Sequence, residues 1–462
     1  MGGTLIQQKP PPLRGTKNRC KIMFQPARGT RDFLPQEMWK RNWIQDNIRS
    51  VFEAYGYGPL GTPVFESWEM LKIKSGEDIL KQIYYFKDKS GRELGLRFEW
   101  TASLARVIAS HRELPRPFKR YAIGPVWRYE RPSEMSRREF WQMDVDIVGV
   151  ADPIADTEVL SVAVDCLKKI GFEGFVIRLN DRRLLESIIR VSGLPTDRYP
   201  EIFRAVDKRK KIGDEGVLKE LGKIGAPFNA SERLLELTST KGNPQETLEK
   251  TRAHISGDAL GLIACDSLGA IVDYAESFSI AQYLIIDLGL ARGLDYYTGP
   301  IFEIYAEGFE GAGSIAGGGR YDNLVETFGG KATPMTGISM GIHRLLSLLE
   351  KMEVFKSKEL GPKVYVAVAS KAVRYKAIAI AQDIRRAGIP TEMEIMNRGL
   401  RKQLDNANRK GFRKVVVVGE RELNEGCVSL RDMGTSEQRM VKIEDLVEEL
   451  YSPPTKSMSN KV

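Results

Sequence analysis

Three arginines stand beside acidic or aromatic residues at well-separated places in this chain of 462 residues. Arg128 lies in Trp-Arg-Tyr-Glu, Arg292 in Ala-Arg-Gly-Leu-Asp-Tyr-Tyr, and Arg344 in Met-Gly-Ile-His-Arg. The planar guanidinium fork and its permanent charge suit the oxygens of a polyphosphate. Any one of these arginines taken alone is more often the partner of a neighbouring carboxylate. Together they indicate a candidate nucleotide-phosphate site.

The glycines of Ala316–Asp322, a stretch that reads Ala-Gly-Gly-Gly-Arg-Tyr-Asp, are by themselves a weak signal. The chain has no GxxxxGK[ST] loop and no GxGxxG turn between a predicted strand and a predicted helix. It therefore lacks the sequence signs of a P-loop or of a Rossmann dinucleotide site. Phosphate contacts would have to come from side chains such as the arginines.

Composition excludes several other kinds of protein. Four scattered cysteines without a CxxC pair, and only three histidines, rule out a disulfide framework and argue against zinc. There is no run of 18 apolar residues and no apolar signal core at the amino terminus. We expect neither a membrane span nor a secretory signal, and the reducing cytoplasm is the expected compartment.

The net charge of +9 is concentrated at one end of the chain. Residues 1–24 hold five basic residues, no acidic one and three consecutive prolines, so we expect a basic flexible tail. The rest of the chain carries only the small positive net charge that remains when these five charges are subtracted from +9. That charge permits nucleic-acid binding through local patches without requiring it.

Hydrophobic periodicity predicts the elements that must position the arginines. Apolar residues at i, i+4 spacing predict a helix after Pro35, and alternation over residues 83–100 predicts a hairpin that turns at Lys89-Ser90-Gly91. Residues 118–150 are typical of two long strands around a polar loop. Asp152 and Pro153 begin another helix.

The second half of the chain changes character twice. Residues 181–278 have a mostly helical pattern, and strand-like sequence resumes at residues 283–287. A helix is expected near Gly341. From Pro362 onward, strand-like runs alternate with helical stretches over about 90 residues, which indicates a small, separately folded α/β domain.

These segments together resemble the class II aminoacyl-tRNA synthetases. Residues 24–35 resemble the opening segment of the histidyl-tRNA synthetase family, and Gly61-Thr62-Pro63 follows its motif 1 helix. Residues 128–140 resemble motif 2, an Arg-x-Glu triplet in a strand–loop–strand, and residues 337–344 resemble motif 3. These motifs indicate the class alone.

Two further segments point to one family within the class. Residues 290–297, Leu-Ala-Arg-Gly-Leu-Asp-Tyr-Tyr, resemble the histidine-specific signature, and residues 316–322 resemble the second such signature. The resemblance covers roughly residues 24–450. Three positions depart from the usual pattern: Phe98, Trp127 and His343. The first two stay apolar, whereas His343 replaces a frequent glutamate and puts an ion pair beside the phosphates in doubt.

The resemblance implies an α+β fold: a class II antiparallel-sheet catalytic domain of six strands with a helical insertion, followed by an α/β anticodon-binding domain. It implies a catalytic domain at 25–180 and 279–350, an insertion at 181–278 and an anticodon-binding domain at 361–452. It further implies an ATP-dependent ligase of protein biosynthesis, a cytoplasmic homodimer. Its substrates would be L-histidine, ATP and tRNA(His), with Mg²⁺ accompanying ATP and no zinc.

The resemblance also implies roles for single residues. Selecting free histidine requires buried donors and acceptors, because unmatched polar groups reject analogues strongly. The histidine-binding residues would be Glu99, Trp100, Thr101, Arg128, Gln142, Asp146, Arg292, Tyr296, Tyr297 and Tyr321. The ATP-binding residues would be Arg128, Glu130, Phe140 and Arg344, with Glu130 as the magnesium ligand. Arg131, Arg137 and Arg138 would meet the acceptor end of tRNA, and Arg128 and Arg292 would be catalytic.

Other interpretations stay open. Gln142, Asp146 and the tyrosines could be ordinary cross-strand pairs of a sheet. A regulatory paralogue of histidine biosynthesis would share the catalytic fold, but such paralogues lack a carboxy-terminal domain. Class II synthetases for threonine, proline or glycine lack the Arg-Gly-Leu-Asp-Tyr-Tyr signature. A nonenzymatic tRNA-binding or signalling protein would have lost the polar pocket residues, which are present here.

Overall fold

The structure is a computed structural model that describes residues 24–73, 77–132, 137–291, 296–358, 360–361 and 363–451. A nine-stranded sheet forms its largest part, and the strands follow the order β1-β5-β6-β12-β11-β10-β7-β9-β8. In that order the strands are Gly58–Pro59, Phe118–Trp127, Glu139–Val148, Met335–Gly341, Ser314–Arg320, Pro300–Ala306, Phe175–Asp181, Leu284–Asp287 and Lys241–Gly242.

The middle of this sheet is antiparallel. Every neighbouring pair from β5 to β7 runs antiparallel, whereas β1 joins β5 and β9 joins β7 in parallel. The two long strands expected within residues 118–150 are β5 and β6. The α+β sheet expected from the resemblance is therefore confirmed, with six antiparallel strands at its centre.

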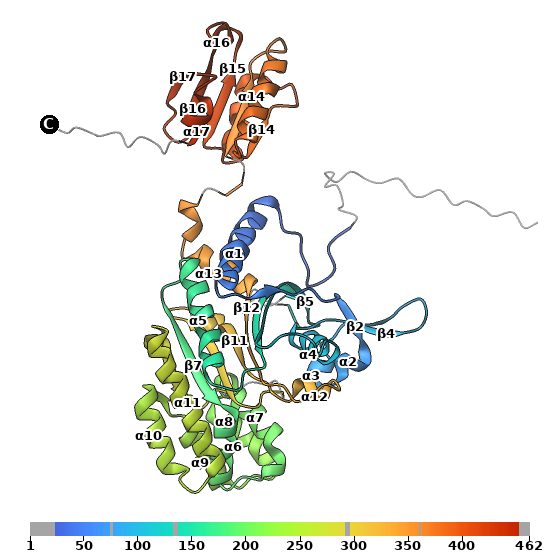
Figure 1. The fold of residues 1–462 in the computed structure, drawn as a ribbon, viewed down its shortest axis with the longest axis vertical. Helices are drawn as coiled ribbons and strands as arrows, with labels where there is room; N and C mark the ends of the chain where they lie inside the picture. Colours follow the sequence, from blue (N-terminus) through green and yellow to red (C-terminus); the bar gives the residue numbers. More distant parts are fainter. Residues whose placement is uncertain are drawn as a thin grey trace, which may run out of the picture.

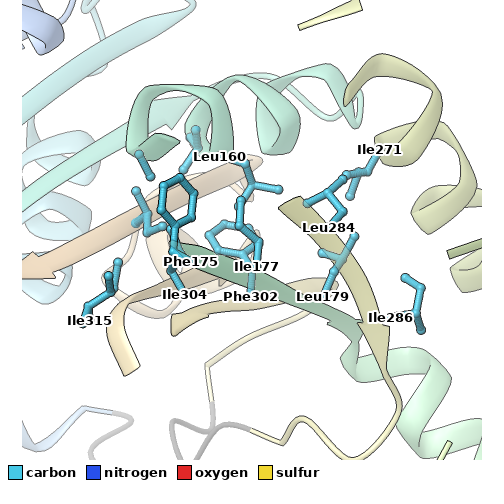
Figure 2. Packing of buried hydrophobic residues seen from close by; sticks show 14 of the residues in the cluster. Leu160, Phe175, Ile177, Leu179, Ile271, Leu284, Ile286, Phe302, Ile304 and Ile315 are labelled. Carbon is cyan, nitrogen blue, oxygen red and sulfur yellow. The ribbon is translucent and has the colours of Figure 1, made fainter. Parts of the chain in front are cut away.

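One face of the sheet is apolar and is covered by helices. These are α1 (Pro35–Ala54), α5 (Ile154–Lys169), α11 (Ala259–Ser277) and α13 (Ile342–Lys351). Figure 2 shows side chains from β7, β9 and β10 packed beneath α5 and α11, including Ile177, Phe302 and Ile304. Because strand side chains alternate between faces, the residues between these positions point to the opposite, polar face.

Helix α5 shows how local chemistry begins an element. The Asp152 carboxylate accepts a hydrogen bond of 2.8 Å from the Ile154 N–H, and Pro153 is the cap residue. The helix thus begins one residue later than the sequence predicts. Gly171, with φ of +85°, follows its end.

Residues 182–277 are mostly helical, as their pattern predicts, and Figure 1 shows them gathered at one end of the large sheet. The helices are α6 (Arg182–Val191), α7 (Tyr199–Asp207), α8 (Arg209–Lys223), α9 (Phe228–Thr238), α10 (Pro244–His254) and α11. Short 3-10 turns η1 (Thr196–Arg198) and η2 (Ala281–Tyr283) lie before α7 and before β9.

A three-stranded sheet has the order β2-β4-β3 and lies on the side of the large sheet away from α5 (Figure 1). The predicted hairpin is present as β3 (Tyr85–Lys87) and β4 (Glu93–Leu96), and β2 is Phe65–Ser67. Its turn is closed by the Gly91 N–H, which donates to the Asp88 carbonyl over 3.0 Å. Neighbouring helices are α2 (Trp68–Lys72), α3 (Glu77–Leu80), α4 (Thr101–Ser110) and α12 (Leu324–Thr327).

The carboxy-terminal part has a sheet of its own, in the order β14-β13-β15-β16-β17. The strands, in chain order from β13, are Val364–Val368, Thr391–Met393, Lys414–Val418, Cys427–Asp432 and Gln438–Lys442. The helices are α14 (Arg374–Arg386), α15 (Leu400–Arg409), α16 (Glu420–Asn424) and α17 (Leu446–Tyr451). Separate apolar clusters cover both of its faces, so this is the expected α/β unit.

Two more 3-10 turns complete the chain: η3 (Glu310–Ala312), between β10 and β11, and η4 (Val354–Ser357), after α13. Among the helices that the structure describes, none has the length and apolar character needed to cross a lipid bilayer.

Candidate functional site

Two cavities lie on the polar face of the large sheet, and both are lined by β6, β11 and β12. The small cavity has a volume of about 50 Å³, and its lining includes Glu99, Thr101, Asp144, Asp146, Tyr296, Tyr297 and Tyr321. The large cavity has a volume of about 210 Å³, and its lining includes Glu130, Arg137, Phe140, His343 and Arg344. Arg128, Gln142, Gly317 and Ser339 line both, so the two cavities are adjacent.

Glycines on β11 and β12 make room for the small cavity. A Cβ atom on Gly337 would lie 2.1 Å from Oδ1 of Asp146, and one on Gly318 would lie 1.9 Å from the Gly337 carbonyl oxygen. No side chain fits at either place. The glycine-rich stretch, a weak signal in the sequence, thus lets two strands and a carboxylate approach closely.

Tyrosine rings line the small cavity, and two of their hydroxyls donate to carboxylates. The Tyr321 hydroxyl donates to Oδ1 of Asp146, and the Tyr296 hydroxyl donates to Oε2 of Glu99 over 3.3 Å. The Tyr296 ring centroid lies 4.8 Å from that of Tyr297 and 5.7 Å from that of Tyr321. The cavity therefore combines aromatic walls with hydrogen-bonding groups of both kinds, which suits a small aromatic ligand that carries polar nitrogens.

The carboxylates at the back of the small cavity resist ionisation. Burial raises the pKa of Asp144 to about 6, and nearby Arg120 opposes this. Burial raises the pKa of Asp146 to about 7; Arg120 again opposes the shift, while Asp144 and Glu99 add to it. Strongly shifted groups in a cavity are typical of functional sites.

Guanidinium groups surround the large cavity. Nε of Arg128 donates to the Phe98 carbonyl over 3.2 Å, and its guanidinium carbon lies 5.3 Å from the Phe140 ring centroid. Arg344 donates to the Ser314 carbonyl, and burial lowers its pKa. Arg128 and Arg344 both line the large cavity, where a guanidinium can bind an anion through paired N–H groups.

Trp100, which the sequence predicts to bind histidine, lines neither cavity. The Trp100 ring packs on Ala122 and Val126, outside both cavity linings, with the guanidinium of Arg97 at 3.7 Å from its centroid. Arg131 is exposed on the loop after β5. Arg292 falls outside the described residues.

The Arg138 side chain is held by contacts within the protein. Its Nη1 donates to the Arg28 carbonyl over 3.3 Å, and its guanidinium lies 3.9 Å from the Tyr129 ring centroid. The turn at Gly29, where φ is +90°, packs against its side-chain carbons. Arg138 therefore joins the amino-terminal segment to the start of β6.

The predicted set leaves out Asp144, Ser339 and Arg120, and it assigns Arg137 to tRNA although this side chain lines the large cavity. Strand alternation could have found Asp144, because it lies two residues before Asp146 and so points to the same face. Nothing local in the sequence marks Arg120. Within the described residues, no cluster of three or more His, Cys, Asp or Glu side chains could hold a metal ion.

Comparison with known proteins agrees with this geometry. Residues 29–345 match the family model described as histidyl-tRNA synthetase, and residues 363–452 match that of an anticodon binding domain. The histidine–tRNA ligase of Pyrococcus furiosus is 40% identical over 427 residues, which are 92% of this chain and 98% of that protein. That of Methanocaldococcus jannaschii is 40% identical over 426 residues, 92% of this chain and 99% of that protein.

A solved structure supports the same family assignment. The crystal structure of histidyl-tRNA synthetase from Nostoc sp. PCC 7120 superposes with a TM-score of 0.81 at 28% identity, covering 93% of this chain and 99% of that one. A family model that matches most of the chain, relatives at 40% identity and a shared fold agree with one another. The chain belongs to the histidyl-tRNA synthetase family.

Proposed function

We propose that this protein is a histidine–tRNA ligase, which activates L-histidine with ATP and transfers it to tRNA(His). The observation that carries the proposal is the pair of adjacent cavities. The small one is built from tyrosines and carboxylates and the large one from arginines, and Arg128 lines both. That arrangement fits an aromatic amino acid beside a polyphosphate.

In the first step, the histidine carboxylate attacks the α-phosphate of ATP and pyrophosphate leaves. The protein mainly positions groups and neutralises charge in such a step. Arg128, between the two cavities, would bind the carboxylate and the α-phosphate together. Arg292 is proposed to bind the α-phosphate from the other side, and Arg344 the distal phosphates. The 3′ adenosine of tRNA then accepts the histidyl group.

The small cavity offers a place for each polar group of histidine. Asp146 and Tyr297 are proposed to recognise the imidazole nitrogens, with Tyr321 holding Asp146 in place through its hydroxyl. Glu99 and Thr101 would bind the ammonium group, with Gln142 and Tyr296 close by. Trp100 supports this segment from behind, because its ring is buried against β5.

Magnesium would accompany ATP. Mg²⁺ is usually held by one or two carboxylates together with substrate phosphates, rather than by a cage of protein ligands. Glu130 lies in the large cavity among three arginines, and Phe140 offers a ring face for the adenine. A single carboxylate facing bound phosphates fits this kind of metal site, and the ion would neutralise charge on the phosphates.

Two separate parts of the chain are proposed to bind the two ends of the tRNA. Residues 361–452 would bind the anticodon arm, and the loop that contains Arg131 would meet the acceptor end, with Arg137 at its border to the large cavity. We further propose a homodimer whose catalytic domain comprises residues 25–180 and 279–350, with 181–278 as an insertion. Sedimentation of the purified protein measures the oligomeric state.

The test of the function is ATP–pyrophosphate exchange across all twenty amino acids. Histidine should support exchange far above every other amino acid, because analogues leave buried polar groups unpaired. Equal rates for histidine and for the other amino acids would refute the assignment. Absence of exchange, together with binding of histidine, would favour a regulatory paralogue instead.

A further inference from the structure

Arg120 is a buried cation placed directly behind the small cavity. It lies on β5 opposite Asp146 of β6 in the sheet register, and only 1% of its side chain is exposed. It lines neither cavity. A fully buried arginine is uncommon and needs an explanation, because taking its charge out of water is costly.

The contacts of Arg120 point to one partner. Its Nη2 lies 2.5 Å from Oδ2 of Asp146, which makes a close ion pair between two buried side chains. Within the described residues, Nε and Nη1 of Arg120 have no hydrogen-bond partner. The charge of Arg120 is its larger effect on the pKa of Asp146, and a hydrogen bond from Arg120 lowers that pKa further.

Asp146 is crowded by other acidic groups. The titratable and charged groups that face it are Asp144 on the same strand, Glu99 before α4, Tyr57 after α1, Tyr321 after β11 and Arg120 on β5. Glu99 and Asp144 both disfavour the ionised form of Asp146. Arg120 is the cation that opposes them.

We propose that Arg120 is a positioning residue for histidine recognition, whose charge keeps the Asp146 carboxylate ionised so that it can accept a hydrogen bond from the imidazole. This inference rests on the proposed function and deepens it. An ionised carboxylate only accepts, and it accepts strongly from an imidazole N–H, whereas a protonated one donates from one oxygen and accepts only weakly through the other. Arg120 itself does not touch the ligand.

The balance of charges supports this role. Burial, helped by Asp144 and Glu99, raises the pKa of Asp146 to about 7 even with Arg120 in place. Removing the arginine charge would raise that pKa further, so Asp146 would be protonated at neutral pH. Each unit of such a shift lowers the ionised fraction about tenfold once the pKa lies above the working pH.

The test is the pH dependence of L-histidine binding, measured by calorimetry on the full-length protein between pH 6.5 and pH 9. Arg120→Met should raise Kd at pH 7 by roughly tenfold or more relative to the unmodified protein, and this ratio should shrink to within about threefold at pH 9. The ratio isolates the protein, because the imidazole of free histidine titrates identically in both experiments.

Two further variants serve as an opposite test and as a control. Asp144→Asn removes a neighbouring negative charge, so its Kd ratio should move in the opposite direction and favour binding at pH 6.5. Arg190→Met breaks the ion pair of 2.6 Å with Asp258 between α6 and α11. It should lower the melting temperature while leaving the pH dependence of histidine binding unchanged, and it controls for general destabilisation.

A Kd ratio for Arg120→Met that stays constant across the pH range would overturn the proposal and make Arg120 a purely structural residue. If that variant does not fold, Arg120→Lys keeps the charge and should bind histidine within a few-fold of the unmodified protein at every pH. A uniform loss of tenfold or more with lysine would also overturn it. Failure of the unmodified protein to bind or activate histidine would instead refute the proposed function.

Discussion

Nη2 of Arg320 lies 2.5 Å from Oδ2 of Asp156, and both side chains are buried. The pair joins the end of β11 to the first turn of α5, and Nη1 of Arg320 also donates to the Val150 carbonyl over 2.9 Å. Tyr321, whose hydroxyl holds Asp146, is the next residue along the chain. The ion pair thus fixes the backbone from which this part of the small cavity is built.

Asp156→Ala should therefore be strongly destabilising. Leaving one member of a buried ion pair without its partner costs about 3–5 kcal/mol. Chemical denaturation measures this loss. Asp46→Ala is a matched control, because Asp46 forms an exposed pair of 2.7 Å with Arg49 on α1 and should cost at most about 1 kcal/mol. Equal effects of the two variants would contradict a special role of the buried pair.

Gly337→Ala should weaken histidine binding by about 10²-fold. Its Cβ atom would lie 2.1 Å from Oδ1 of Asp146, so the carboxylate or β12 must move. A displacement of this size at a binding group commonly costs about 10²-fold. The KM for histidine in pyrophosphate exchange measures it. Gly269→Ala in α11, where the new Cβ meets nothing within 4 Å, should leave KM unchanged and stabilise the protein slightly.

Stability should depend on pH through Asp144. Burial raises its folded pKa to about 6, above the unfolded value near 4, so the folded state holds this proton more tightly. Stability from this group is fully present below about pH 4 and is lost as pH rises toward 6. Asp144→Asn removes the titration. As the pH rises from about 4 to about 6, the free energy of unfolding of the unmodified protein should therefore fall by about 3 kcal/mol relative to that of this variant. A constant difference would exclude this effect.

Arg292→Ala should slow adenylate formation by about 10²–10³, in line with the loss of one donor to a developing oxyanion. A cation aimed at charge that grows in the transition state affects kcat more than KM. Lysine should restore activity only in part, because it offers a point charge instead of a fork. Pre-steady-state adenylate formation on a folded variant measures the step. A rate within a few-fold of normal would mean that Arg292 merely shapes its turn.

Deleting residues 361–462 should separate the two reactions. The carboxy-terminal sheet has its own apolar clusters, so its removal leaves the core beneath the large sheet intact. Pyrophosphate exchange should be largely retained, and aminoacylation of tRNA(His) should be lost. In the intact protein, tRNA affinity should fall steeply with salt, because phosphate contacts release counterions. Equal loss of both activities would favour a role for this domain in supporting the dimer.

The sequence by itself determined the family, the class of fold and about half of the residues that line the two cavities. The class motifs and the histidine-specific segments are local, and period-two alternation places Gln142 and Asp146 on one face of a strand whatever the strand pairs with. Alternating strands and helices after residue 362 likewise predict an α/β unit without reference to the rest of the chain.

Only the tertiary structure decided which side chains meet across strands. The pairing of Arg120 with Asp146 depends on the register between β5 and β6, and a shift of one residue would turn Arg120 to the other face. The same holds for Arg320 and Asp156, which lie 164 residues apart along the chain. The packing of Trp100 outside the cavity linings also depends on contacts between distant segments, and so does the hydrogen bond from Arg138 to the Arg28 carbonyl. Such contacts arise from non-local pairing, which leaves no periodic mark in the sequence around either partner.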